Sequence, residues 1–281
     1  MLTSMTLYGR NVLFRIEIFI SALFIILTGI LAFKILPVCP AVMEESVRRS
    51  PGIIQNFIAH FLAPSPYVPF LSLAGGGLYS LVTLVLIYLS FEKTQAPEII
   101  FISLFVLSFS FETIRLLIPL QKIRTIPSAY LLMGSQVLLF GRFFGIFALF
   151  AAGVYAAGLE VQKQLNVILI IAFISLVVSL GIPIDILTWD SSFSMINGYL
   201  SLFRMTETVV FVMTMMSFFI SAWSRGTPEY VAIGLGSFLA YAGRNILLSG
   251  DTWISPFPAL LLLAAGAWLI CTKLHKVYLW L

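Results

Sequence analysis

Long apolar stretches, each bounded by proline, glycine or charged residues, recur along the whole chain. Most are about as long as the roughly 20 residues that a helix needs to cross a bilayer. Because backbone polar groups in lipid must find partners within the protein, these stretches predict helices rather than open strands. We therefore expect an all-α polytopic membrane helix bundle of about eight transmembrane helices, with seven to nine left open, at residues 13–36, 70–91, 98–119, 128–157, 165–187, 196–223, 229–248 and 256–275.

The rest of the chain consists of short loops and one longer segment, residues 37–69, so residues 1–281 are expected to form a single transmembrane domain. Within the longer segment, residues 53–62 place apolar side chains at helical spacing. This spacing predicts a short helix in the outer membrane interface, and a mobile lid over an outward-facing cavity is the alternative.

The two halves of the chain show a weak internal similarity. Pro97 and Glu98 open the third stretch, and Pro228 and Glu229 open the seventh. The pattern is consistent with a four-plus-four internal repeat, as in some transporters. It is equally consistent with the general preference of proline and glutamate for the first turn of a helix.

Composition narrows the class of protein further. Of the 281 residues, 60% are hydrophobic and only 10% are charged, against about 25% in soluble domains. A mean hydropathy of +1.05 excludes a disordered chain and a water-soluble enzyme of ordinary composition. The net charge of +4 is small and dispersed, so the expected partner is the lipid bilayer and not nucleic acid.

The distribution of charge in the loops predicts the orientation. Cytoplasmic loops are enriched in lysine and arginine, whereas the loops at 188–195 and 249–255 contain Asp190 and Asp251 and no basic residue. Placing these loops outside puts both termini in the cytoplasm, and the expected location is a bacterial cytoplasmic membrane. Cys39 and Cys271 then lie near opposite faces, so no disulfide is expected.

Seven ionisable residues fall within or at the end of the predicted spans. Each costs roughly 2.5–3.5 kcal/mol at the bilayer centre, so such residues normally face the protein interior and pair with one another. With both termini inside, all seven are expected between the middle of the membrane and its outer surface. They are Glu112 and Arg115, three residues apart; Arg142; Asp185; Arg204 and Glu207, also three apart; and Arg244.

Small residues at a spacing of four indicate which helices pack closely. Gly141 and Gly145 flank Arg142, and Ala232, Gly236 and Ala240 lead to Arg244. Such stripes let the backbones of neighbouring membrane helices approach one another. We therefore expect the fourth and seventh spans to lie at crowded helix interfaces.

The charged residues suggest a function. Four arginines against three carboxylates leave a local excess of one positive charge, and a guanidinium can hold an oxyanion through two hydrogen bonds. We expect a protein that binds or transports an anionic solute or lipid headgroup, or the membrane part of a sensor whose output would need a partner protein. Arg142, Arg204 and Arg244 would contact the anion, Glu112 and Glu207 would orient them, and Arg115 would belong to the same ligand-binding site.

Two other functions remain open. One is an intramembrane enzyme acting on a lipid-linked substrate, with Glu112 or Glu207 as general base. The other is a structural or assembly subunit whose charges pair internally. The sequence has only two histidines and two cysteines and no nucleotide-binding or nucleophile-elbow motif, so we expect no catalytic residue, metal or cofactor.

Overall fold

The structure is a computed structural model that describes residues 6–36, 65, 67–94, 96–123, 127–158, 164–189, 192–250 and 252–279. Eight helices in these ranges are long and apolar enough to cross a membrane, and the chain is an integral, multi-pass membrane protein. The all-α bundle predicted from the apolar stretches is thus confirmed. The elements are α1 (Leu7–Ile35), α4 (Val68–Phe91), α5 (Pro97–Leu107), the 3₁₀ helix η2 (Ser108–Leu116), α6 (Leu117–Ile123), α7 (Ser128–Ala156), α8 (Gln164–Gly181), β1 (Ile184–Trp189), β2 (Met195–Asn197), α9 (Leu200–Arg225), α10 (Glu229–Ser249) and α11 (Pro256–Leu279).

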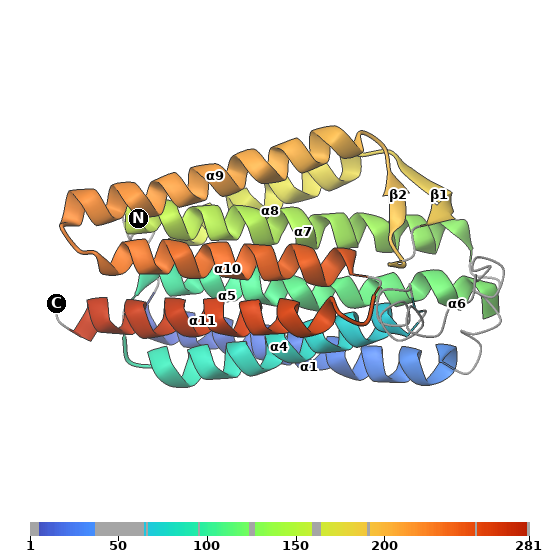
Figure 1. Cartoon of the computed structure of the whole chain (residues 1–281), viewed down its shortest axis with the longest axis horizontal. Helices are drawn as coiled ribbons and strands as arrows, with labels where there is room; N and C mark the ends of the chain where they lie inside the picture. Colours follow the sequence, from blue (N-terminus) through green and yellow to red (C-terminus); the bar gives the residue numbers. More distant parts are fainter. Residues whose placement is uncertain are drawn as a thin grey trace, which may run out of the picture.

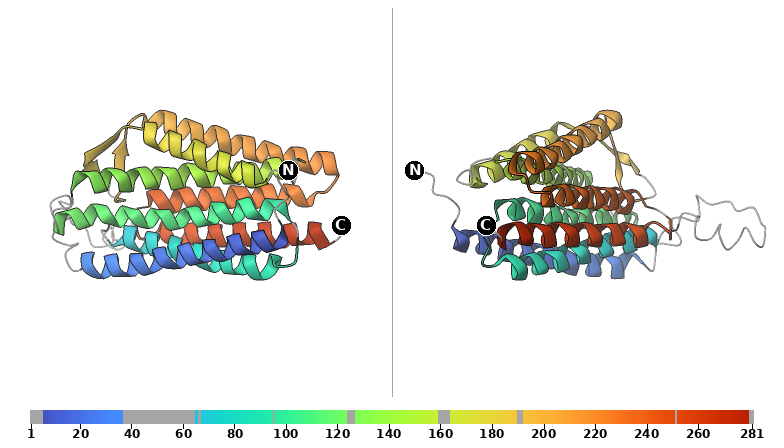
Figure 2. Two further views of the ribbon diagram at one scale, coloured as in Figure 1. Left: turned by 180° about the vertical axis from the view of Figure 1, so that it is seen from behind. Right: turned by 60° about the vertical axis from the view of Figure 1, so that its left-hand side comes forward.

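The long helices run side by side along one common axis (Figure 1). Helix α1 begins and α11 ends at one end of the bundle, here called the terminal end, and β1 and β2 lie at the opposite end, the hairpin end (Figures 1 and 2). The third span, made of α5, η2 and α6, is the most enclosed. In it, 89% of an 18-residue apolar segment is buried, against 22% in α1 and in α8. The third span therefore forms the centre of the core.

This central span is not the single helix that the sequence predicted over 98–119. Its middle part, η2, winds as a 3₁₀ helix for nine residues, although such runs rarely exceed 3–4 residues. Pro119 lacks the N–H that would bond to the carbonyl of Arg115 in an α-helix, which favours another winding just before it. With about three residues per turn, side chains three positions apart align, and this brings Glu112 and Arg115 together.

A second difference concerns the connection between the fifth and sixth spans. The sequence predicted helices to residue 187 and from residue 196, but the structure has the antiparallel hairpin β1–β2, with Ile184 opposite Asn197. Pro183 explains the end of α8, because proline has no backbone N–H and disfavours helical geometry in the residue before it. The hairpin packs back onto the bundle through Phe193, whose ring meets that of Phe70 edge-on at 5.2 Å.

Helices α10 and α11 make the closest backbone approach described in the fold. A Cβ added to Gly266 would lie 2.7 Å from the carbonyl oxygen of Gly236 and 2.8 Å from the nitrogen of Ala240. A Cβ on Gly243 would lie 2.8 Å from the carbonyl oxygen of Ala259. The small residues noted in the seventh span thus serve close helix packing against α11.

Several predictions concern residues outside the described ranges. The interfacial helix at 53–62 and Cys39 both lie there, while Cys271 is a free thiol on α11. The two Pro-Glu helix starts of the proposed internal repeat are close in space, because Tyr230 donates a hydrogen bond to Glu98 at 3.3 Å. Their carboxylates have different partners, since Glu229 pairs with Lys276 at 3.0 Å.

Candidate functional site

A buried ion pair between the third and fourth spans forms the centre of the site. Glu112 of η2 accepts two hydrogen bonds from Arg142 of α7, from Nε at 2.7 Å and from Nη2 at 2.9 Å. Arg115, one 3₁₀ turn after Glu112, approaches the same carboxylate with Nη1 at 3.4 Å. One carboxylate therefore balances two guanidinium groups from different helices. Both oxygens of the Glu112 carboxylate already accept hydrogen bonds from guanidinium groups, which suits a counter-ion better than a general base.

Helices α9 and α10 extend this pair into a network. Arg244 of α10 donates from Nη1 to Glu207 of α9 at 3.3 Å and from Nη2 to the backbone carbonyl of Arg142 at 3.3 Å. The five side chains form one connected group, here called the arginine cluster: Glu112, Arg115, Arg142, Glu207 and Arg244. It joins η2, α7, α9 and α10, and it carries three positive and two negative charges.

Two glycines of α7 allow the central pair to form. A Cβ on Gly141 would lie 2.6 Å from Cβ of Phe111, and one on Gly145 would lie 2.3 Å from Oγ of Ser108. Both distances are shorter than real contacts, so only glycine permits α7 to lie this close to η2. The Gly-x-x-x-Gly spacing thus sets the distance across which Arg142 reaches Glu112.

The arginine cluster is not equally buried on all sides. The side chains of Glu112, Arg115 and Arg244 are 6% exposed or less, whereas those of Arg142 and Glu207 are 12% and 14% exposed. Nη1 of Arg142 makes no hydrogen bond with any residue that the structure describes. The cluster therefore has one partly open edge, on the side of α7 and α9, where a guanidinium keeps donors available.

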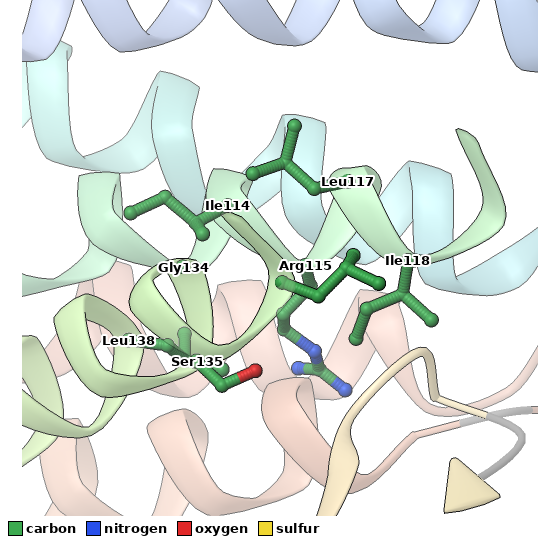
Figure 3. A pocket seen from close by; sticks show the side chains of 8 residues that line it. Ile114, Arg115, Leu117, Ile118, Gly134, Ser135 and Leu138 are labelled. Carbon is green, nitrogen blue, oxygen red and sulfur yellow. The ribbon is translucent and has the colours of Figure 1, made fainter. Parts of the chain in front are cut away.

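The hairpin covers the other side of the cluster. Arg115 donates to the carbonyl of Ser192, just before β2, and to that of Leu248 at 3.2 Å. In Figure 3 its guanidinium extends past Ser135 toward the hairpin. The pocket beside it has a volume of only 10 Å³, about the minimum for one water molecule. An anion has no room on this side.

Two of the seven predicted site residues lie outside the arginine cluster. Arg204 is exposed on α9 and forms no ion pair with Glu207 in the described structure, although the two residues are three positions apart. Glu207 pairs across the helix interface with Arg244 instead. Asp185 lies on β1 and is exposed. Five of the seven predicted residues thus form the arginine cluster, and Arg204 and Asp185 are exposed.

Sequence reasoning overlooked a polar face on the first span. The buried residues of α1 include Arg10, Glu17, Ser21 and Thr28, while most of its exposed positions are apolar. Arg10 donates to the carbonyls at the end of α4, including that of Phe91 at 2.6 Å, and so caps that helix. The regular spacing of these polar residues inside an apolar stretch was the signal available in the sequence.

Glu98 is a second buried carboxyl that the sequence did not single out. It lies at the terminal end, where Tyr278 donates to it at 2.7 Å and Tyr230 at 3.3 Å. Arg225 donates to the hydroxyl of Tyr230 at 3.0 Å. This second network joins α5, α10 and α11 with the end of α9, and its carboxyl is already hydrogen-bonded on both oxygens.

No protein-family model matches the sequence. The chain is similar to an uncharacterized protein of Treponema pallidum (strain Nichols), with 25% identity over 194 residues, which covers 62% of this chain and 56% of that relative. The chain thus spans little more than half the length of this relative. No activity is assigned to that relative.

Proposed function

We propose that this membrane protein binds an anionic amphiphile, with its carboxylate or phosphate group held at the open edge of the arginine cluster by Arg142 and Arg244. The observation that carries the proposal is that unused donors of Arg142 coincide with the least buried part of the cluster. An oxyanion there would receive charge-assisted hydrogen bonds, which are stronger in an apolar surrounding than in water.

A cavity beside this edge favours an amphiphile over a small solute. It measures about 310 Å³, lies between α7, α8 and α9, and has only apolar lining. Val210 on α9 is three residues from Glu207, and Phe147 on α7 is five residues from Arg142. Along the helix axes these separations are about 4.5 and 7.5 Å. A headgroup at the arginines would therefore place its hydrocarbon chain beside this cavity.

The proposal predicts how binding depends on headgroup and chain. Octyl phosphate should bind the purified protein at least tenfold more tightly than inorganic phosphate, and octanol should bind weakly, in calorimetric titrations. Arg142→Ala and Arg244→Ala should each weaken octyl phosphate binding by about tenfold or more, because a hydrogen bond to a charged group contributes about 1.5–3 kcal/mol.

Two variants act as controls for this titration. Arg15→Ala removes an exposed arginine of α1 and should leave the affinity unchanged. Met213→Trp should fill the apolar cavity, so it should reduce the affinity for octyl phosphate but not that for inorganic phosphate. Unchanged binding in a well-folded Arg142→Ala variant would contradict the proposal.

A structural role is the second candidate, and the double hydrogen bond between Arg142 and Glu112 favours it. In that case the cluster serves only to fasten α7, α9 and α10 to η2. Octyl phosphate would then not bind the wild-type protein, and the only effect of the arginine variants would be a lower stability. Transport of the bound anion is an extension of the first proposal, and uptake into proteoliposomes would test it.

A further inference from the structure

Glu17 is an isolated carboxyl group deep inside the helix bundle. Only 1% of its surface is exposed. It lies ten residues after the start of α1, about 15 Å along the helix axis. Neither carboxyl oxygen has a hydrogen-bond partner among the described residues. The hydroxyl of Ser103 on α5 faces it but donates to the carbonyl of Ile100 at 2.7 Å.

No cation compensates the charge of this carboxyl in the described structure. Around it, Arg10 bonds to backbone carbonyls and Arg15 to a tyrosine, so neither is an ion-pair partner. An ionised carboxylate without a partner is strongly disfavoured in an apolar interior, and the group becomes neutral by binding a proton. The titratable groups on the elements packed around α1 near this position are Tyr79 and Tyr88 on α4, Glu98 on α5, and Glu112 and Arg115 on η2.

A row of buried hydroxyl groups begins one helical turn beyond Glu17. The hydroxyl of Ser110 on η2 lies 3.0 Å from those of Ser21 on α1 and Ser80 on α4, so it can accept a hydrogen bond from Ser21 and donate one to Ser80. Ser80 in turn donates to the carbonyl of Val106 at 2.9 Å. All three serines are fully buried. The interface between α1, α4 and η2 is therefore polar at a depth where apolar packing would be expected.

The row continues toward the hairpin end. Thr28 of α1 donates to the carbonyl of Phe24 at 2.8 Å and lies 3.0 Å from the hydroxyl of Thr113 on η2, from which it can accept. Thr113 directly follows Glu112 of the arginine cluster. Hydroxyl groups both donate and accept hydrogen bonds, so water that enters this interface would find partners along its length. The polar face of α1 thus extends from Glu17 toward the hairpin end, as far as the residue that follows Glu112 in the sequence.

We propose that Glu17 is a proton-binding site within the membrane and that the hydroxyl-lined interface gives its proton access from the side of the arginine cluster. An O–H bond forms at Glu17 with a proton taken from water, and the same proton returns to water on release. Its role rests on the proposed function: at pH values where the unliganded protein has released the proton of Glu17, oxyanion binding at Arg142 and Arg244 is accompanied by its uptake. A proton fits this tightly packed site, whereas a sodium ion needs several oxygen ligands around it.

Infrared spectroscopy of the full-length protein in lipid tests the site itself. The wild-type protein should show the C=O band of a protonated carboxyl at neutral pH. Glu17→Gln should remove one such band, while Glu92→Gln, which changes an exposed glutamate, should keep it. If Glu17→Gln fails to fold, Glu17→Asp should keep the band at a shifted frequency. An identical carboxyl region in wild type and Glu17→Gln would overturn the proposal.

The pH dependence of octyl phosphate binding tests the coupling. If one proton is taken up with the anion, the affinity difference between wild type and Glu17→Gln should appear only above the pH at which the infrared band of unliganded Glu17 disappears. There the wild-type affinity should fall with rising pH by up to about tenfold per pH unit more steeply than that of Glu17→Gln. The headgroup titrates equally in both proteins, so their difference isolates Glu17. Parallel pH profiles, or a sodium dependence that Glu17→Gln removes, would overturn the coupling.

These measurements separate the two proposals. If octyl phosphate does not bind the wild-type protein, the proposed anion function fails, and the infrared band still decides whether Glu17 holds a proton. Arg142→Ala should lose octyl phosphate binding and the associated proton uptake but keep the carboxyl band. Loss of that band in Arg142→Ala as well would contradict an independent proton site at Glu17.

Discussion

Glu112→Gln is expected to lower the free energy of unfolding by about 3–5 kcal/mol, the range measured when one partner of a buried ion pair is removed. The glutamine is similar in shape but leaves Arg142 and Arg115 without their shared counter-charge. The loss can be measured as a shift in unfolding by denaturing detergent in mixed micelles, followed by tryptophan fluorescence.

A double variant and an exposed control make this result specific. Glu112→Gln combined with Arg142→Met should lose less stability than the sum of the single variants, because the second change removes a charge that the first left unpaired. Glu92→Gln, on the exposed end of α4, should stay within about 0.5 kcal/mol of wild type. A Glu112→Gln variant as stable as wild type would show that the cluster does not hold the helices together.

Gly266→Ala is expected to have the second large effect. The added methyl group would lie 2.7 and 2.8 Å from backbone atoms of α10, and backbone cannot move aside as a flexible side chain can. Overpacking of a close-packed interior costs about 1–3 kcal/mol, and this variant should reach the upper end of that range. Thermal unfolding and the yield of folded protein in lipid nanodiscs measure the effect.

Gly29→Ala is the matched control for this change. A methyl group at Gly29 in α1 would meet no atom within 4 Å. Since alanine is better than glycine in a helix by roughly 0.5–1 kcal/mol, this variant should be as stable as wild type or slightly more so. Equal effects of the two substitutions would mean that the contact between α10 and α11 does not limit stability.

The spans could be predicted from the sequence because a membrane helix is determined by the residues of its own stretch. Apolar length alone identifies a membrane helix, and the eight helices of the structure overlap all eight predicted stretches. The hairpin β1–β2 was missed because Ile184, Ile186 and Leu187 extend the apolar stretch of α8 beyond Pro183. The 3₁₀ winding of η2 was missed because hydropathy carries no information on the number of residues per turn.

The site was only partly predictable for a different reason. The position of each residue within its span predicted that Glu112, Arg115, Arg142 and Arg244 lie at a common level in the membrane. The structure joins these four residues through hydrogen bonds. Rotation of each helix about its axis decides the actual partners, and it turns Arg204 outward while Glu207 faces α10. Tertiary packing fixes this rotation, and a single sequence does not reveal it.

The 3₁₀ winding of η2 has a mechanical consequence. Nine residues span about 18 Å in a 3₁₀ helix but about 13.5 Å in an α-helix, so rewinding would shorten the central span by about 4.5 Å. It would also turn Arg115 by about 60° relative to Glu112, since three α-helical residues cover about 300°. A change of pitch in η2 would therefore move Arg115 away from Ser192 and remove one of the contacts that hold the hairpin to the bundle.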